Sequence, residues 1–537
     1  MTIHRHEGSD CLFSLTVSLR VYLRKLGFTL GCLLCLGVWP IHCQTPRLDL
    51  LQAVGSALSH HPQLAAQQAQ IEFSEGAKAI ESSIFDPLLQ SGLTQNLTIA
   101  PPLVPGFNAV GPGTDTINQT NYSLTGAKLY RDGISVNPYS QINRETDSYF
   151  YPNGYNSSAV GVTVTVPLLR RRGSKVVAAP ERAAEMEVRA AQHDFDFLLA
   201  NIANSVAQNY WALVAAYRNL DVALSAESRG HIYVESTQAL IDADHVPRSD
   251  INEVRANLAE RTAARIAAQN SLVVARQRLS QAMGRSAEEI IQPLGDPADD
   301  FPFAPAAMEL SESGSSLRHD LSQALVRRAD YLAAVIRKQK ILVLLPAAQN
   351  ALRPALNVSL GGGYQGVRGG RGPEYFFASP FSGVRGPTVS AGVTYSYPLG
   401  NHAALGSLQQ LQANIRQADV SVQELARAIS ETTTVAVDSV SSAVLRVEKA
   451  RQTVDLAQEA LTGAREKYRE GFGSVVEILQ FEDRLNSALA EQVQARLDYA
   501  IALTQYRFAV GTLVPSNQQT PVIRKEAFMN PISNEEP

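Results

Sequence analysis

The chain has 537 residues, of which 45% are hydrophobic and 18% are charged, and its formal net charge at pH 7 is −4. A charge so close to neutral gives no electrostatic basis for nucleic-acid binding, which needs a basic surface. Length alone would suggest about three or four globular domains. The long helical periodicities described below predict one elongated unit instead.

Residues 1–43 are predicted to be a signal peptide. A basic patch precedes an apolar run from Leu26 to Trp39, which is too short to span a bilayer as a helix and suits a signal-peptide core. All four cysteines lie in this segment, so its removal leaves a chain with no disulfide framework that is held together by packing. The residues before Cys32 and Cys43 form no convincing lipid-attachment motif, so we do not expect lipidation.

Two helices of similar layout precede the strand-like segments of the chain. The first covers residues 48–84, with an early break at His61-Pro62, and the second covers residues 318–351. A shift of 267 residues brings Ala57-Leu58 onto Ala324-Leu325, which indicates an internal repeat far too long for a solenoid.

Four segments alternate apolar with polar or small residues at a period of two, which predicts strands. They are Leu89 to Ile99, Val160 to Val166, Leu356 to Leu360 and Val389 to Tyr397. Any one of them alone would suggest a soluble half-buried sheet. Four of them between very long helices favour tilted strands of an outer-membrane barrel. Residues of about 100–157 hold a weaker strand pair around Tyr122–Ile142, which the sequence does not place.

Each return strand leads into a long helix, at about 174–243 and 401–470, and each long helix turns into a returning helix, at 248–284 and 475–511. The helix from 401 has the heptad pattern of helices packed side by side. Its apolar and small residues recur at Leu408, Leu411, Ile415, Ala418, Val422, Leu425, Ile429, Thr432 and Ala436. Roughly 70 residues form a rod about 105 Å long, so we expect a function that needs length.

We divide the chain after residue 43 into a first repeat at 44–300, a linker at 301–317, a second repeat at 318–513 and a tail at 514–537 that is expected to be flexible. In each repeat, the first helix and the returning helix together equal one long helix in length. Two shorter helices stacked end to end would therefore match one long helix.

In these features the sequence resembles the outer membrane efflux protein family, the TolC-like ducts. The resemblance is carried by Ala57-Leu58 with His61 to Leu64, by the pairs Pro167-Leu168 and Pro398-Leu399, and by the run from Tyr468 through Val476 to Leu479 and on to Gly511-Thr512-Leu513. It implies an α+β membrane protein. By this resemblance, a homotrimer forms a 12-stranded outer-membrane β-barrel, four strands from each copy, which continues into a long periplasmic α-helical barrel.

One part of that expectation follows from the residues themselves. Four strands cannot close a barrel, and lipid tolerates no open sheet edge, so copies of the chain must combine. Cyclic symmetry is the usual arrangement of such copies. That the number of copies is three comes from the resemblance.

The resemblance implies a passive exit duct in the outer membrane of a Gram-negative cell, in contact with outer membrane lipid and with a periplasmic extension. It would expel small molecules together with an inner-membrane transporter and a periplasmic adaptor protein. The outer-membrane component of a type I protein secretion system is an alternative within the same fold. A periplasmic adaptor with one coiled-coil hairpin, or a coiled-coil adhesin without a pore, is an alternative of another class. The adaptor conflicts with the duplicated order and the four membrane-type strands, and the adhesin predicts long low-complexity stalks and one C-terminal anchor, which the sequence does not show.

No motif of enzyme chemistry is visible. The sequence has no GxxxxGK[ST] phosphate loop, no HExxH and no GxSxG, so we expect no catalysis, no cofactor and no metal. His60-His61 would be a poor chelate because adjacent helical residues point apart. The glycine runs 361–363 and 369–372 precede no helix start and are interpreted as strand and loop flexibility, and Arg170 to Arg172 as an interfacial charge cluster.

The two helix–helix turns are the sharpest candidates for function, since the resemblance places them at the end that closes the tunnel and docks an adaptor. Ser249 and Ser474 precede the returning helices and are predicted N-caps. The candidate docking residues are Asp244, His245, Val246, Pro247 and Arg248 in one turn and Gly471, Phe472, Gly473 and Ser474 in the other.

Four residues beside these turns are candidates for a periplasmic gate. Glu477 and Gln480 fall where the founding member of the family carries a pair of aspartates, and their equivalents in the first repeat are Asp250 and Glu253. Three copies of one carboxylate in a constriction would attract cations and repel anions. The same residues also suit the first turn of a helix, where the dipole favours acids, and the sequence leaves both interpretations open.

Overall fold

A computed structural model describes residues 47–101, 114–148, 152–244, 246–292, 294–305, 317–370, 372–379, 383–514 and 523–530. All of them belong to one compact unit that begins at Pro46. The predicted signal peptide with its four cysteines lies outside the described residues, and so does His245 of the first predicted docking turn.

The helices that precede the strands are each broken in two. They are α1 (Leu50–His60) with α2 (Pro62–Ser83), and α8 (Leu317–Arg327) with α9 (Ala329–Ala351). The predicted break at His61-Pro62 is confirmed. Pro62 is the first residue of α2, and the His61 ring accepts a hydrogen bond from the backbone N–H of Gln63 at 3.2 Å, so this histidine caps the helix.

Two long helical hairpins follow the strands. They consist of α4 (Ala179–Asp242) with α5 (Asp250–Ala282), and of α11 (His402–Arg469) with α12 (Val475–Val510). The 68 residues of α11 correspond to a rod of about 102 Å. The described residues also contain the short helices α3 (Ser174–Val177), α6 (Ala287–Ile290), α10 (Pro373–Ala378) and α13 (Glu526–Met529).

The heptad pattern of α11 predicts its buried side with one slip. Ile429 and Ala436 are buried as expected, but between them the buried residue is Thr433 rather than Thr432. The buried series then continues through Val440 to Val444 on the same side. Both positions hold threonine, so helix propensity does not distinguish them. The position of the helix packed against α11 decides which threonine is buried.

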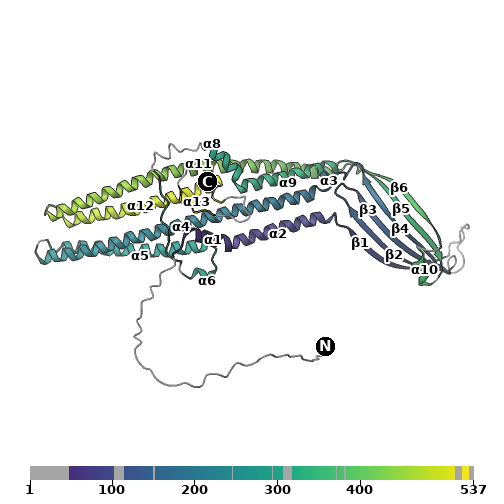
Figure 1. The fold of residues 1–537 in the computed structure, drawn as a ribbon, viewed down its shortest axis with the longest axis horizontal. Helices are drawn as coiled ribbons and strands as arrows, with labels where there is room; N and C mark the ends of the chain where they lie inside the picture. The colour runs from purple at the N-terminus through teal and green to yellow at the C-terminus, as the bar shows by residue number, and fades with distance from the viewer. Residues whose placement is uncertain are drawn as a thin grey trace, which may run out of the picture. The chain divides into compact units, whose positions relative to one another are not determined.

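The helices pack in the order α2, α4, α9, α11, with α5 lying along α4, α12 along α11, and α12 also against α4. Figure 1 shows the strands at one end of these helices and the turns of the two hairpins at the other. At the end of α5, Gly284 (φ 70°) lies against His61 and Pro62. At the end of α12, Gly511 (φ 78°) lies against Arg327 and Arg328. Each returning helix therefore ends beside the break in a helix pair.

The strands form one antiparallel sheet in sequence order from β1 to β6. They are β1 (Leu88–Ala100), β2 (Asp115–Leu129), β3 (Ser135–Thr146), β4 (Tyr155–Pro167), β5 (Ala355–Gly369) and β6 (Val384–Ser396). The expectation of four strands in each copy is wrong, because the described residues contain six. The weak pair around Tyr122–Ile142 is part of two full strands, β2 and β3, which lie between β1 and β4.

One face of the sheet is largely apolar along β1, β4, β5 and β6, whereas on β2 and β3 the same face carries a few apolar residues beside polar ones such as Asn118, Thr120 and Arg144. Residues directly opposite each other share a face, and the register pairs Leu93 with Tyr122 and Tyr122 with Ile142. That face carries Leu89, Leu93, Leu97, Ile99, Tyr122, Leu124, Val136, Ile142, Val160, Val162, Val164, Val166, Val358, Leu360, Tyr364, Val389, Ala391, Val393 and Tyr395. The opposite face is mainly polar or small, as in the row Gln90, Thr125, Tyr139, Gly161, Gly363 and Thr388.

The largest apolar core lies midway along α4. Tyr210 and Trp211 are fully buried there, with their rings edge to face at 5.4 Å between centroids, and Ala500 of α12 belongs to the same core. The Tyr210 hydroxyl donates to the backbone oxygen of Leu48 at 2.9 Å, which ties the start of the described chain to this core.

The expectation of a flexible tail is wrong for residues 523–530. Helix α13 packs against α12, and Phe528 is fully buried in the core around Trp211. Lys525 forms an ion pair with Asp299 at 2.5 Å. A buried aromatic ring and an ion pair to a distant segment hold this part of the tail in place, and a pattern search for long elements does not detect so short a helix.

Candidate functional site

The turn between α11 and α12 is tightly specified by its backbone. Gly471 has φ 82°, and the N–H groups of Gly471 and Phe472 donate to the carbonyls of Tyr468 and Lys467. This is the Schellman arrangement that ends helices, and it favours glycine because the left-handed conformation strains other residues. The Phe472 ring is 85% exposed, so it is presented to solvent rather than used for packing.

The predicted N-caps of the two returning helices differ. Ser474 accepts a hydrogen bond from the N–H of Glu477 at 3.2 Å, so its predicted cap is confirmed. The prediction for Ser249 is wrong, because that residue has helical dihedrals and its hydroxyl donates to the Asp250 carboxylate at 3.1 Å. In the turn before α5, Asp244 adopts the left-handed backbone conformation, with φ 58°.

The structure places the other predicted docking residues in exposed or half-exposed turns. Asp244, Pro247 and Arg248 are exposed, and Val246 is half-buried. In the second turn Gly473 is half-buried and Ser474 is exposed. Figure 1 shows both turns at the same end of the helices, away from the sheet.

The predicted gate residues lie close in sequence to the members of a small apolar cluster. Val254 of α5 packs against Val475 and Leu479 of α12, so the cluster joins the ends of the two hairpins. Burial raises the pKa of Tyr468, and the charge of Asp250 adds to that shift. Within the described residues, none of the side chains of Glu253, Glu477 and Gln480 forms an ion pair, and all three are at least partly accessible to solvent.

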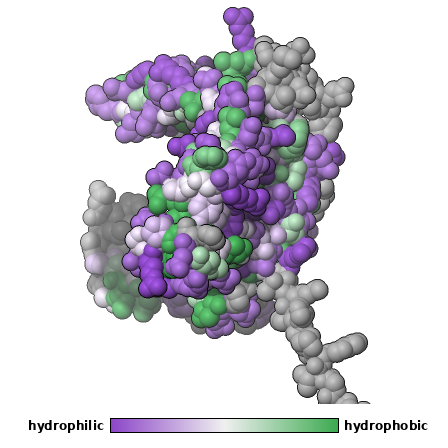
Figure 2. All heavy atoms as spheres, turned by 90° about the vertical axis from the view of Figure 1, so that its left-hand side faces the viewer, coloured by the Kyte–Doolittle hydropathy of each residue, from purple (hydrophilic) through white to green (hydrophobic). Residues whose placement is uncertain are grey.

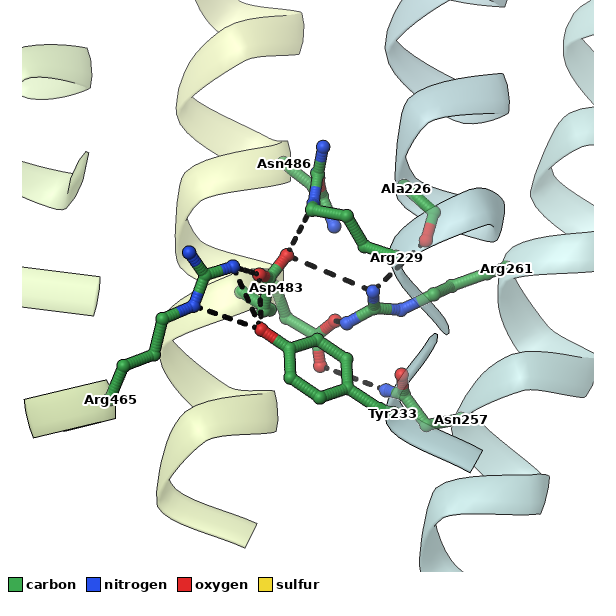
Figure 3. A network of polar contacts seen from close by, with 9 residues as sticks. Ala226, Arg229, Tyr233, Asn257, Arg261, Arg465, Asp483 and Asn486 are labelled. Carbon is green, nitrogen blue, oxygen red and sulfur yellow. Dashed lines mark hydrogen bonds and ion pairs between the residues drawn. The ribbon is translucent and has the colours of Figure 1, made fainter. Parts of the chain in front are cut away.

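A buried ionic network that the sequence reasoning missed lies two to three turns from the hairpin ends (Figure 3). Its centre is Glu482 of α12, which is fully buried. The carboxylate accepts from Arg229 Nε at 2.8 Å, from the Tyr233 hydroxyl at 2.8 Å and from Arg465 Nη2 at 2.6 Å. Arg261 Nη1 stands at 3.8 Å. The network thus contains residues from all four hairpin helices, α4, α5, α11 and α12.

Outer contacts orient the arginines of this network, which we call the Glu482 network. Arg229 donates to Asn486 at 2.5 Å, and Arg465 donates to the Tyr233 hydroxyl at 2.8 Å. Arg261, which is 5% exposed, donates to the carbonyl of Ala226 at 3.1 Å and pairs with Asp483 at 3.3 Å, as Figure 3 shows.

The charges of the network compensate for burial. Burial alone would raise the pKa of Glu482, but hydrogen bonds from Arg229 and Tyr233 and the charges of Arg229 and Arg261 outweigh it, so its pKa is lowered. The pKa of Tyr233 is raised by burial and by the neighbouring carboxylate. Glu482 stays ionised, and because its carboxylate is fully buried, the loss of its arginine partners would leave a buried charge without compensation.

One sequence signal could have indicated this network. Glu482 lies between Leu479 and Leu485, at the three-residue spacing that marks the packed side of α12. An acidic residue at a core position needs cationic partners, and that argument predicts arginines on the facing helices without saying which ones.

The remaining predicted features take part in local structure. His60 Nδ1 lies 2.7 Å from the Ser59 hydroxyl, and His61 is a helix cap. In the described part of the chain, no group of three or more His, Cys, Asp or Glu residues is close enough to hold a metal ion. Arg171 has φ 64°, and its N–H donates to Asn350 at 2.7 Å, so the arginine cluster 170–172 begins a tight turn after β4.

A family profile described as "Outer membrane efflux protein" matches residues 132–285 and 321–512. The chain belongs to the outer membrane efflux protein family. Among curated relatives, the outer membrane protein TolC of Escherichia coli (strain K12) is 21% identical over 405 residues, which cover 72% of this chain and 76% of that protein. TolC of Vibrio cholerae is 22% identical over 343 residues, which cover 62% and 72%.

Solved structures share the fold. The outer-membrane channel OprN aligns with a TM-score of 0.61 at 18% identity and covers 86% of this chain and 90% of its own. The Campylobacter jejuni CmeC outer membrane channel aligns with a TM-score of 0.59 at 15% identity and covers 88% and 87%. VceC from Vibrio cholerae aligns with a TM-score of 0.60 at 16% identity and covers 86% and 96%.

The predicted family membership is thereby confirmed, and the protein is an outer membrane protein with the mixed helix and strand fold of the efflux channels. The family is one of channels rather than enzymes. Among the described residues, no helix is both long and apolar enough to pass through a lipid bilayer.

Proposed function

We propose that three copies of this chain form a passive exit duct, which expels small molecules together with a periplasmic adaptor and an inner-membrane transporter. The observation that carries the proposal is the sheet with one apolar and one polar face, joined directly to helices about 100 Å long. Such a sheet can face lipid on one side and water on the other. The helices extend the same wall into the periplasm.

The duct must be built from several copies. Strands β1 and β6 are the two edges of the sheet, and unpaired backbone groups at an edge are too costly in lipid. A neighbouring copy satisfies both edges when the ring closes. The number three is taken from the efflux channels that this chain resembles.

The hairpin ends form the opposite mouth of the duct in this proposal. Asp250, Glu253, Glu477 and Gln480 would line the constriction, and copies of the carboxylates would favour cations there. The exposed turns would dock the adaptor, through Asp244 to Arg248 in one hairpin and Gly471 to Ser474 in the other. The exposed Phe472 ring suits an apolar contact with such a partner.

Purified protein reconstituted into planar bilayers tests the duct. We expect discrete conductance steps with a preference for cations from a species that native mass spectrometry identifies as a trimer. The substitution Glu477→Gln should lower the cation preference, whereas Glu459→Gln on the exposed side of α11 should not. Folded protein that forms no trimer would refute the proposed assembly.

Export from cells tests the partners. The charge reversal Arg248→Glu should reduce export of a dye in a strain that depends on this protein, because the turn would no longer fit the adaptor. Arg278→Glu, on an exposed site of α5 far from the turn, is the matched control. Normal export by the Arg248 variant would place the docking site elsewhere.

A further inference from the structure

We infer that three copies close a barrel of 18 strands, in which β1 of each copy pairs with β6 of the next. The inference takes the number of copies from the proposed function and goes beyond it in the width of the pore. Its basis is that each chain supplies six neighbouring strands.

The register of β2 and β3 makes them part of the wall. All 13 residues of β1 have a partner in β2, and β3 pairs with β4 from Ser135 to Glu145. Leu124 and Ile142 lie on the same face as Leu93 of β1 and Val160 of β4. A hairpin folded into the lumen would leave the facing edges of β1 and β4 unpaired or would pair them with each other.

The turn of this hairpin is fixed where the helices meet the sheet. Lys128 Nζ donates to the carbonyl of Phe85, just before β1, at 2.5 Å. The N–H of Gly173, just after β4, donates to the carbonyl of Asp132 at 2.9 Å. Arg131 pairs with Glu181 of α4 at 2.5 Å. Contacts to both flanking segments keep the hairpin between β1 and β4.

The width of six strands matches the helices below them. The four helices α2, α4, α9 and α11 pack side by side, and at 8–10 Å between axes they cover roughly 32–40 Å of circumference. Six strands about 4.8 Å apart and tilted by about 40° cover about 38 Å.

The helices next to β1 and β6 indicate that a second copy of the chain pairs with each edge of the sheet. Helix α2 leads into β1 and α11 follows β6, so each edge strand continues into a helix with unpartnered apolar residues. Phe73 and Ile80 of α2 are 71% and 70% exposed, and Leu405 and Val420 of α11 are 50% and 57% exposed. One neighbour that pairs with the strand edge also covers the apolar side chains of the helix beside it.

The consequence is a wider exit. Barrel diameter grows roughly in proportion to strand number, so 18 strands give a barrel about one and a half times as wide as 12 strands. The cross-section open to cargo would be about twice as large.

Electron cryo-microscopy of the full-length trimer in lipid nanodiscs tests the inference directly. We expect 18 strands in cross-section, with β1 beside β6 of the adjacent copy. A trimer with 12 strands would overturn the inference and leave the proposed duct intact. A preparation without trimers in native mass spectrometry would overturn both, so the oligomer is measured first.

Fluorescence provides a second test that does not depend on image resolution. In vesicles with brominated acyl chains, the tryptophan fluorescence of the variant Leu124→Trp in β2 should be quenched as strongly as that of the variant Leu93→Trp in β1. The control Asn121→Trp, on the opposite face of β2, should be quenched several-fold less. Quenching at position 93 without quenching at position 124 would remove β2 from the lipid-facing wall.

Discussion

Two of the contacts between the helical hairpins differ in their chemistry. Midway along α4, Trp211 and Tyr210 are buried in an apolar core that includes Ala500 of α12. Near the hairpin ends, the contact is the Glu482 network of one carboxylate, three arginines and a tyrosine. Apolar contacts depend on shape and area alone, whereas the ionic contact depends on every partner and on protonation.

The hairpins can separate more easily where their contact is ionic than where it is apolar. The core around Trp211 remains stable when any one small contact changes. The Glu482 network has no equally stable partly broken state, because a buried charge without its partner is costly. In the proposed duct, the hairpin ends are therefore the part whose arrangement responds most readily to a change in partners or conditions.

The substitution that removes the apolar contact should have the greatest effect on stability. Trp211→Ala should lower the free energy of unfolding by about 3–5 kcal/mol, because a fully buried ring leaves a cavity. The purified protein should melt at a lower temperature in detergent. Phe472→Ala, which removes a ring that is 85% exposed, is the control and should leave the melting temperature nearly unchanged. If both substitutions lowered the melting temperature equally, the core around Trp211 would not be the main source of stability.

A comparable but local effect should follow from Glu482→Ala. Three arginines and Tyr233 would lose their shared acceptor, at a cost of about 3–5 kcal/mol, confined to the hairpin ends. Limited proteolysis should cut the two turns faster, while the core around Trp211 remains protected. Glu482→Gln preserves size and some hydrogen bonds and should have a smaller effect. Uniform protection in the alanine variant would contradict a local role.

Acid should affect the two regions differently. The folded-state pKa of Glu482 is lowered, so its contribution is fully present above its ordinary pKa of 4.5 and is lost as pH falls through the folded value. Spin labels on α4 and α12 should move apart near the hairpin ends below pH 4.5, while a pair beside Trp211 keeps its distance. An equal increase in distance at both positions would show that acid does not act selectively on the Glu482 network.

The smallest effect concerns the turns themselves. Ser474→Ala should destabilise the start of α12 by about 1 kcal/mol, because Ser474 caps the N–H of Glu477. Ser249→Ala is the matched control, since Ser249 makes no such cap. Hydrogen exchange should rise in the first turn of α12 and stay unchanged in that of α5. Faster exchange in both would show that the cap bond is not the cause.

Much of the fold was predictable because its elements are long. The heptads of α11 and the four alternating strands arise from periodicity, and the break at His61-Pro62 arises from a proline, and neighbouring residues encode both directly. Strands β2 and β3 were not placed, since their apolar face is reduced to a few residues such as Tyr122, Leu124 and Ile142. Their position between β1 and β4 comes from backbone pairing, which leaves little trace in such a polar sequence.

The candidate site also has parts that the sequence predicts and parts that it does not. The turns are visible in the sequence from Gly471 and Pro247, and the cap at Ser474 is predicted because this serine directly precedes the returning helix. The Glu482 network was missed because its members are spread over four helices, and Arg229 and Glu482 stand 253 residues apart. A charge at a core position indicates that partners exist but does not identify them.

The lengths of the helices, the turns between them and the apolar positions follow from residues that are neighbours along the chain, so the amino-acid order alone predicts them. The six strands of the sheet, the burial of Phe528 that holds residues 523–530 in place and the three arginines around Glu482 follow from the folded structure. Those features depend on contacts between distant segments, where burial and pairing outweigh local preference.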